Sequence, residues 1–108
     1  MEQYEWEEAE KAVRSGVNVT LCIDGYEVTL EPVKYNGFST AVLPFVNGEY
    51  KSEWLLKDCE ERRRFYHVAN IRLQGFREIE DCRAIWTSFE LMKRCFEKNN
   101  GSIELLKE

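Results

Sequence analysis

The chain has 108 residues, of which 44% are hydrophobic and 32% charged, and its formal net charge at pH 7 is −5. This composition excludes a disordered chain, and no apolar run approaches the roughly 20 residues that a membrane-spanning helix needs. A chain of this length builds one core, so we expect a single domain over residues 1–108. The acidic first residues lack the basic and apolar segments of a signal peptide, which predicts a cytoplasmic protein.

The charge is distributed unevenly along the chain. Residues 1–54 carry ten acidic and four basic side chains, whereas residues 55–108 carry ten acidic and eleven basic ones. The two halves therefore have net charges of −6 and +1. Binding to a nucleic acid backbone normally uses a basic stripe, so we expect a protein partner rather than a direct nucleic acid contact. Direct contact would require Arg62–Arg64, Arg72 and Arg77 to cluster.

Residues 3–15 predict the first helix. Its glutamates and its apolar residues lie on opposite sides at helical spacing. The apolar stripe consists of Tyr4, Trp6, Ala9, Ala12 and Val13. Gly16 is the expected end of this helix, because glycine readily adopts the left-handed conformation that follows a helix.

Three dipeptides predict tight hairpin turns: Asp24-Gly25, Asn36-Gly37 and Asn47-Gly48. Each lies between short runs of β-branched or aromatic residues, and both turn residues tolerate a positive φ. If all three turns contain two residues, residues 17–54 form a four-stranded antiparallel meander. The helices would then cover one face of this sheet, giving an α+β fold.

The turns also predict which residues face each other. On the inner face they pair Ile23 with Tyr26, Leu21 with Val28, Val19 with Leu30, Leu30 with Leu43, Val28 with Phe45, Phe45 with Tyr50, and Ala41 with Trp54. The opposite face then carries threonines, carboxylates and an apolar end formed by Val33, Tyr35, Phe38 and Val42.

Two further helices are expected in the second half of the chain. The first covers residues 55 to about 73, with a loop or short strand over residues 67–73 as the alternative, and Gly75 interrupts the pattern. The second covers residues 76–98 and is ended by Asn99-Asn100-Gly101. Its apolar stripe consists of Ile79, Cys82, Ile85, Trp86, Phe89, Met92 and Phe96. The tail after it either frays or adds Ile103 and Leu105 to the core.

No residue pattern indicates catalysis, a cofactor or a metal site. The single histidine, His67, is eight residues from Cys59, too far along a helix for a direct hydrogen bond, and it is interpreted as a partly exposed residue. The four cysteines form no C-x-x-C pair, and in a cytoplasmic protein we expect mostly buried thiols rather than the two disulfides of a secreted chain. We therefore interpret the protein as non-enzymatic.

The strongest candidate for function is the outer face of the predicted sheet. Its proposed partner-binding residues are Glu27, Glu31, Tyr35, Phe38, Glu49 and Glu53. Carboxylates around aromatic anchors suit a basic surface on another protein, which they would attract electrostatically. Arg62, Arg63 and Arg64 form a secondary basic patch, or simply a solvated helix face.

The first predicted strand suggests a different function. Residues 17–23 carry no charge, so as a sheet edge this strand would be unprotected against pairing with another chain. The alternative interpretation is therefore a self-associating assembly module, in which a homodimer pairs these strands or buries the outer faces.

Residues 47–66, with the sequence NGEYKSEWLLKDCEERRRFY, resemble a segment of small phage and prophage proteins. In those proteins a strand ending in a Gly-Lys/Trp-Leu-like motif leads into an acidic and arginine-rich helix. The resemblance implies a phage-type accessory protein acting in the cytoplasm of a bacterial host cell, and it implies no catalytic residue. Small acidic phage proteins of similar size include inhibitors of host defence such as anti-CRISPR proteins. By this analogy of size and charge, the partner would be a host protein with a basic surface.

Overall fold

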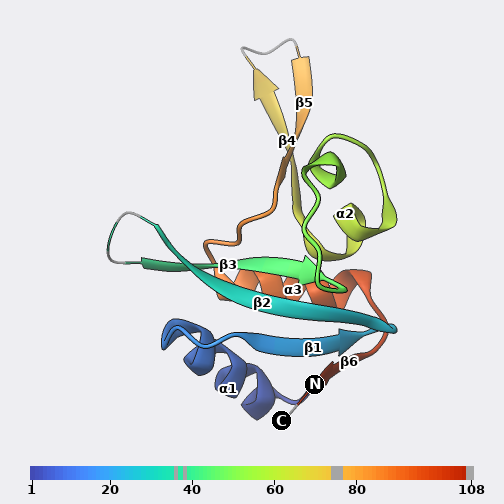
Figure 1. Cartoon of the computed structure of the whole chain (residues 1–108). Coiled ribbons are helices and arrows are strands. Elements are labelled where there is room, and N and C mark those ends of the chain that lie inside the picture. Colours follow the sequence, from blue (N-terminus) through green and yellow to red (C-terminus); the bar gives the residue numbers. More distant parts are fainter. Residues whose placement is uncertain (36, 38, 74–76, 107–108) are drawn as a thin grey trace.

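The computed structural model describes residues 1–35, 37, 39–73 and 77–106 and confirms an α+β fold (Figure 1). In chain order, the helices are α1 (Gln3–Arg14), the 3₁₀ helix η1 (Ser52–Leu55), α2 (Glu60–Phe65) and α3 (Phe89–Asn99). The strands are β1 (Val19–Ile23), β2 (Tyr26–Tyr35), β3 (Ser39–Val46), β4 (His67–Leu73), β5 (Arg77–Arg83) and β6 (Ile103–Leu105). They form an antiparallel sheet in the order β3-β2-β1-β6 and a separate hairpin of β4 and β5.

Helix α1 follows its prediction, with one exception. Trp6, Ala9 and Val13 are buried, whereas Tyr4 is 62% exposed and does not belong to the buried stripe. The carboxylate of Glu5 accepts a hydrogen bond from the backbone N–H of Glu2 at the start of the helix. After Arg14 the chain leaves the helix through Gly16 at φ +87°, as expected for a glycine at this position.

The first hairpin has the predicted register. Asp24 and Gly25 both have positive φ, and Ile23 faces Tyr26 across the turn. Leu21 consequently lies opposite Val28, and the alternate residues of both strands point into the core.

The second hairpin is offset by one residue from its prediction. Tyr35 faces Ser39, so three residues rather than two separate the paired positions. As a result Leu30 faces Pro44 instead of Leu43, and Val28 faces Val46 instead of Phe45. An offset of one residue reverses the faces of a strand. Val42, predicted on the outer face, is therefore buried, whereas Leu43 and Phe45 move to the outer face.

The predicted fourth strand is wrong. Asn47 and Gly48 form the expected turn, and Val46 pairs with Glu49, but the chain then leaves the sheet and enters η1. The fourth strand is instead β6, which pairs with the last residues of β1. The predicted pairing of Ala41 with Trp54 does not form, because the Trp54 ring packs against Tyr66, 6.1 Å between centroids.

The β3 edge of the sheet contacts another segment of this chain, and β1 is an inner strand rather than an edge. At the β3 edge, Val42 exchanges two backbone hydrogen bonds with Trp86, at 2.8 and 2.9 Å. The Tyr66 hydroxyl donates to the Pro44 carbonyl at 3.0 Å. At the other side β6 pairs with β1 and places Ile103 and Leu105 against the core. The uncharged first strand therefore has a partner within the chain, and it is not the open edge that favoured self-association.

The second half of the chain differs most from its prediction. The predicted helix over residues 55–73 is replaced by η1, α2 and β4, so residues 67–73 form the strand that was the alternative. The predicted helix over residues 76–98 begins as β5 and becomes helical only at α3. Gly75 lies outside the described residues. The β4–β5 hairpin projects away from the rest of the molecule (Figure 1), and α3 ends at Asn99 as predicted.

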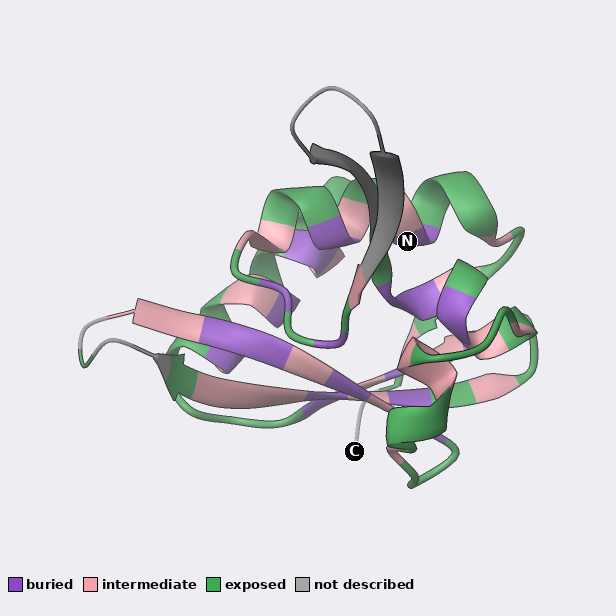
Figure 2. Ribbon diagram, turned by 90° about the horizontal axis from the view of Figure 1, so that it is seen from above, coloured by how far each residue is buried: buried purple, intermediate pink, exposed green. Residues whose placement is uncertain are grey.

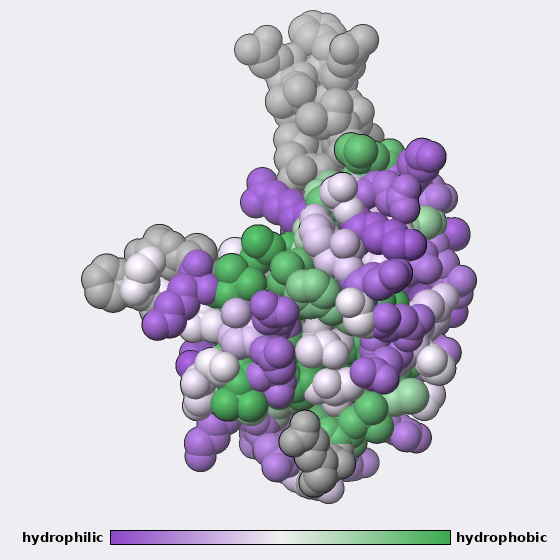
Figure 3. All heavy atoms as spheres, viewed as in Figure 1, coloured by the Kyte–Doolittle hydropathy of each residue, from purple (hydrophilic) through white to green (hydrophobic). Residues whose placement is uncertain are grey.

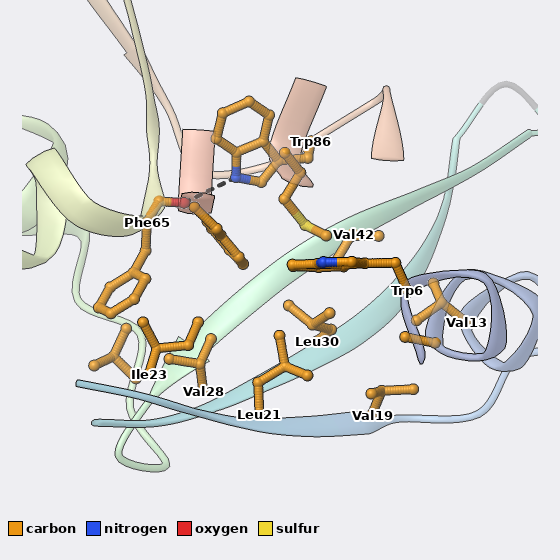
Figure 4. Close-up of a cluster of buried hydrophobic side chains, with 14 residues drawn as sticks. Trp6, Val13, Val19, Leu21, Ile23, Val28, Leu30, Val42, Phe65 and Trp86 are labelled. Carbon is orange, nitrogen blue, oxygen red and sulfur yellow. Dashed lines mark hydrogen bonds between the residues drawn. The ribbon is translucent and has the colours of Figure 1, made fainter. Parts of the chain in front are cut away.

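All three α-helices contribute side chains to the core on one face of the sheet (Figure 2). Figure 4 shows the strand side chains pointing together toward the helices, with Trp6 and Trp86 above them. The Trp86 indole N–H donates to the Phe65 carbonyl at 2.9 Å, which links the segment before α3 to the end of α2. None of the three α-helices in the described part of the chain lies on the opposite face of the sheet, here called the outer face (Figure 2).

Candidate functional site

The outer face presents three carboxylates around a small polar centre. Glu27 and Glu104 lie opposite Cys22, one on each neighbouring strand, so two strand spacings of about 4.8 Å separate their backbones. Glu31 lies four residues further along β2, roughly 13 Å away. Between them the hydroxyls of Thr20 and Thr29 are hydrogen-bonded at 3.3 Å.

These carboxylates are available to a partner. Within the described part of the chain, Glu27, Glu31 and Glu104 have no ion pair and no side-chain hydrogen bond, and no lysine or arginine lies on the outer face of the four strands. Glu27 and Glu104 are exposed and Glu31 is half-buried. A carboxylate without an internal partner keeps its full attraction for an external cation.

An aromatic pair stands beside the carboxylates. Phe45 faces Thr29 from β3, and its ring contacts that of Tyr50, 6.3 Å between centroids. Both residues are half-buried. In Figure 3, which looks onto this side of the molecule, apolar and hydrophilic side chains alternate over the sheet. The outer face therefore combines an apolar contact with negative charge.

The predicted site residues are not all on this face. Glu27 and Glu31 lie there as expected. Glu49 lies in the turn after β3 and pairs with Lys51 at 3.4 Å, and Glu53 lies on η1, so the prediction that both extend the sheet face is wrong. Phe38 and the side chain of Tyr35 lie outside the described part of the structure.

Sequence reasoning missed Glu104 and misplaced Phe45. Glu104 reaches the face only because the tail becomes β6, and the alternation of Ile103, Glu104 and Leu105 was the available signal. Phe45 was assigned to the core because the second hairpin was given a two-residue turn. A three-residue loop there would have placed it correctly.

The three consecutive arginines differ in exposure and in partners, although Arg62 and Arg63 line the same cavity, here called the α2–α3 cavity after the two helices in its wall. Arg62 is buried, with 7% of its surface exposed, and Arg63 is exposed and pairs with Asp58 at 3.2 Å. Arg64 points elsewhere and pairs with Glu60 and Asp24, both at 2.8 Å. They do not form one patch, as the 100° separation of successive helical residues requires.

Asp24 joins three segments of the chain. Besides Arg64, its carboxylate accepts hydrogen bonds from the backbone N–H groups of Gly101 and Ser102, both at 2.8 Å. These backbone bonds, together with the Arg64 guanidinium, hold the Asp24 pKa below its ordinary value of 3.8. This arrangement fixes the first hairpin to α2 and to the start of β6, and we assign it a structural role.

The described histidine, cysteine and acidic side chains do not form a metal site. Among the described residues, no group of three histidine, cysteine or acidic side chains is close enough to hold a metal ion. His67 is exposed, and its ring stacks at a tilt on Trp86, 5.2 Å between centroids. The four cysteines are half-buried rather than mostly buried, and burial raises the pKa of the Cys95 thiol.

Of the helices in the described ranges, none combines the length and the apolar character needed to cross a membrane. Comparisons of this chain with protein-family models, with curated proteins and with solved structures found no match. The functional assignment therefore rests on the geometry of the chain itself.

Proposed function

We propose that this protein is a non-enzymatic binding protein whose outer sheet face docks onto a basic surface of another protein. The observation that supports it best is the group formed by Glu27, Glu31 and Glu104, three carboxylates that have no cation beside them among the described residues of the sheet. Burying such a face against apolar surface would be costly, whereas a basic partner offsets the loss of water with ion pairs.

A nucleic-acid-binding protein is the class of partner that best matches this acidic face. The binding surfaces of such proteins are rich in lysine and arginine, and they also bind a chain that places negative charges at regular spacing. An acidic sheet face can occupy such a surface and exclude the nucleic acid. This is the activity of a phage-type inhibitor of a bacterial host protein, including the anti-CRISPR type, and it agrees with the net charge of −6 in the first half of the chain.

Self-association through the same face is the less favoured function. A two-fold symmetric contact would bring Glu27, Glu31 and Glu104 of two copies together, and like charges placed opposite each other are destabilising. The internal pairing of β1 with β6 removes the other argument for a dimer.

The test compares two charge-reversal variants as bait in a bacterial lysate. The first is Glu27→Lys/Glu31→Lys/Glu104→Lys on the outer face. The control is Glu7→Lys/Glu90→Lys/Glu97→Lys, which makes the same charge change at exposed positions of α1 and α3. Each captured protein is then purified, and its affinity for the three baits is measured at low and high salt.

We expect the wild-type protein and the control to retain a basic, nucleic-acid-binding partner and the outer-face variant to bind it at least about tenfold more weakly. Binding should also weaken as salt rises, because exposed charge pairs are screened. Equal binding by all three baits would contradict the proposal. A dimer that disappears in the outer-face variant would support self-association instead.

A further inference from the structure

Two Asn-Gly pairs of the described chain, Asn47-Gly48 and Asn100-Gly101, have very different surroundings. In such a pair the backbone nitrogen of the glycine can attack the side-chain carboxamide of the asparagine, because glycine has no side chain to hinder the approach. The attack closes a succinimide ring. Asn36, which precedes Gly37 in a third pair, lies outside the described residues.

The attacking nitrogen of the first pair is accessible to solvent. Asn47 and Gly48 are exposed and form the turn after β3, with φ of +52° and +78°. Within the described part of the chain the Gly48 N–H makes no hydrogen bond, and nothing lies within 4 Å of the place that a Cβ on Gly48 would take. A base from solvent can therefore reach this N–H and remove its proton.

The carboxamide of Asn47 is held in place by β2. Its Oδ1 accepts a hydrogen bond from the backbone N–H of Glu27 at 2.9 Å, and the Asn47 N–H donates to the Glu27 carbonyl at 2.7 Å. When the Gly48 nitrogen attacks Cγ, negative charge develops on Oδ1. A backbone N–H that already points at this oxygen stabilises the charge, as the donors of an oxyanion hole do. The Nδ2 group has no partner among the described residues, so nothing there retains it.

The second pair is protected by its hydrogen bonds. The Gly101 N–H donates to the Asp24 carboxylate at 2.8 Å, and the negative charge beside it opposes the loss of its proton. Nδ2 of Asn100 donates to the carbonyls of Arg64 and Phe96, at 3.2 and 3.0 Å. The Arg64 guanidinium donates to Oδ1 at 3.0 Å and would also stabilise charge there. The attacking nitrogen, however, is bound to another group, so the ring does not close.

We propose that Asn47-Gly48 is a site of self-modification, at which the Gly48 nitrogen attacks Cγ of Asn47 and the neutral turn becomes negative. The Gly48 N–H gives its proton to solvent, the Cγ–Nδ2 bond breaks, and Nδ2 takes up a proton from solvent and leaves as ammonia. Water then opens the succinimide at either carbonyl and yields aspartate or isoaspartate, with no oxidant or reductant. The product places a carboxylate beside Glu27. The reaction does not depend on the proposed function.

The test is a time course of the wild-type protein at mildly alkaline pH, in buffer and in urea. Peptide mapping by mass spectrometry measures the replacement of amide by carboxyl at each asparagine, and fragment ions locate it. In the folded protein we expect Asn47 to convert at least about tenfold faster than Asn100, because only Asn47 combines a free nucleophile with a placed donor. In urea the two rates should become similar. Equal rates in buffer, or a difference that persists in urea, would overturn the inference.

The variant Asp24→Gly tests the protection of the second pair. It removes the acceptor of the Gly101 N–H, and glycine tolerates the positive φ of +47° at this position. We expect conversion at Asn100 to accelerate severalfold, while Asn47 in the same sample keeps its rate and serves as the internal control. Equal acceleration at both pairs would show that opening of the whole fold sets both rates, and this result would overturn the inference.

Discussion

The outer sheet face and the α2–α3 cavity differ in construction and in how far the sequence discloses them. The outer face is negative and open, and its residues follow from the alternation of side chains along strands. The cavity is recessed, and its described walls come from segments that meet only in the folded chain. A surface built on one sheet can thus be predicted from local patterns, whereas a cavity between helices depends on the tertiary arrangement.

The comparison shows why net charge is a limited guide to binding. The value of −5 describes the whole chain, whereas Arg63 and Lys98 both line the described part of the α2–α3 cavity. The potential that a ligand meets depends on the nearest charges and on the low dielectric of the wall beside them. The two surfaces can therefore be disturbed separately, and the largest effects are expected where the cavity wall joins the core.

Trp86→Ala should have the largest effect on stability. The side chain is 3% exposed, belongs to the core and also forms the cavity wall. Its truncation leaves a void and removes the donor to the Phe65 carbonyl, so we expect the free energy of unfolding to fall by about 3–5 kcal/mol. Urea denaturation measures this loss. A loss below about 1 kcal/mol would show that the wall is not part of the core.

Tyr66→Phe distinguishes the role of the Tyr66 hydroxyl at the sheet edge from a role in the cavity. The hydroxyl donates to the Pro44 carbonyl in a buried position, and the rest of the ring is kept in the variant. We expect a loss of about 1–2 kcal/mol in the free energy of unfolding, because the buried carbonyl loses its donor. Urea denaturation measures this loss as well. An unchanged free energy of unfolding would assign the hydroxyl to the cavity instead of the sheet edge.

Asp24→Asn tests the contact that joins the first hairpin to α2 and β6. The quantity to measure is the pH dependence of the free energy of unfolding. Because folding lowers the Asp24 pKa below 3.8, the folded state holds this proton less tightly than the unfolded state. Its contribution to stability is fully present above the ordinary pKa and is lost as pH falls through the lower, folded value. We expect wild type to be more stable than Asp24→Asn at pH 7 and the difference to shrink toward pH 3. A difference independent of pH would contradict a charged role for Asp24.

The outer-face variant Glu27→Lys/Glu31→Lys/Glu104→Lys should have the smallest effect on stability. These carboxylates have no partners in the described part of the chain, so each change should alter the free energy of unfolding by no more than about 0.5 kcal/mol. Thermal unfolding with circular dichroism measures it. A loss of several kcal/mol would show that the face serves the fold rather than a partner.

The first half of the fold could be predicted because its signals are local. Asp24-Gly25 sets the register of β1 and β2 through the conformations of two adjacent residues, and Gly16 ends α1 in the same way. The second hairpin shows the limit of this reasoning. Asn36-Gly37 indicates a turn, but loop length decides register, and a third loop residue reversed the faces of β3.

The second half could not be predicted from periodicity. Ile79, Cys82 and Trp86 recur at helical spacing, yet the first two belong to β5, where they pair with residues of β4. Trp86 is buried because it pairs with Val42 at the sheet edge, a contact between residues 44 positions apart. Pairing over such distances depends on the whole fold, and tertiary context overrides local preference.

The outer face and the cavity divide in the same way. Glu27 and Glu31 were found because strand alternation places them on one face, and Glu104 was missed because β6 forms only by pairing with β1. The cavity was not predicted, since helix α2 directs Arg62 and Arg63 toward it but Arg64 away from it, and Lys98 joins them from α3.

One measurement tests the outer face as the binding surface most directly. A ¹⁵N-labelled sample is titrated with a nona-arginine peptide, and the shifted amide signals are mapped by NMR. The account predicts that the peptide shifts the amides of Thr20, Glu27 and Glu104 and leaves those around Arg63, Trp86 and Lys98 in place. Equal shifts around the cavity, or peptide shifts confined to α1, would contradict it.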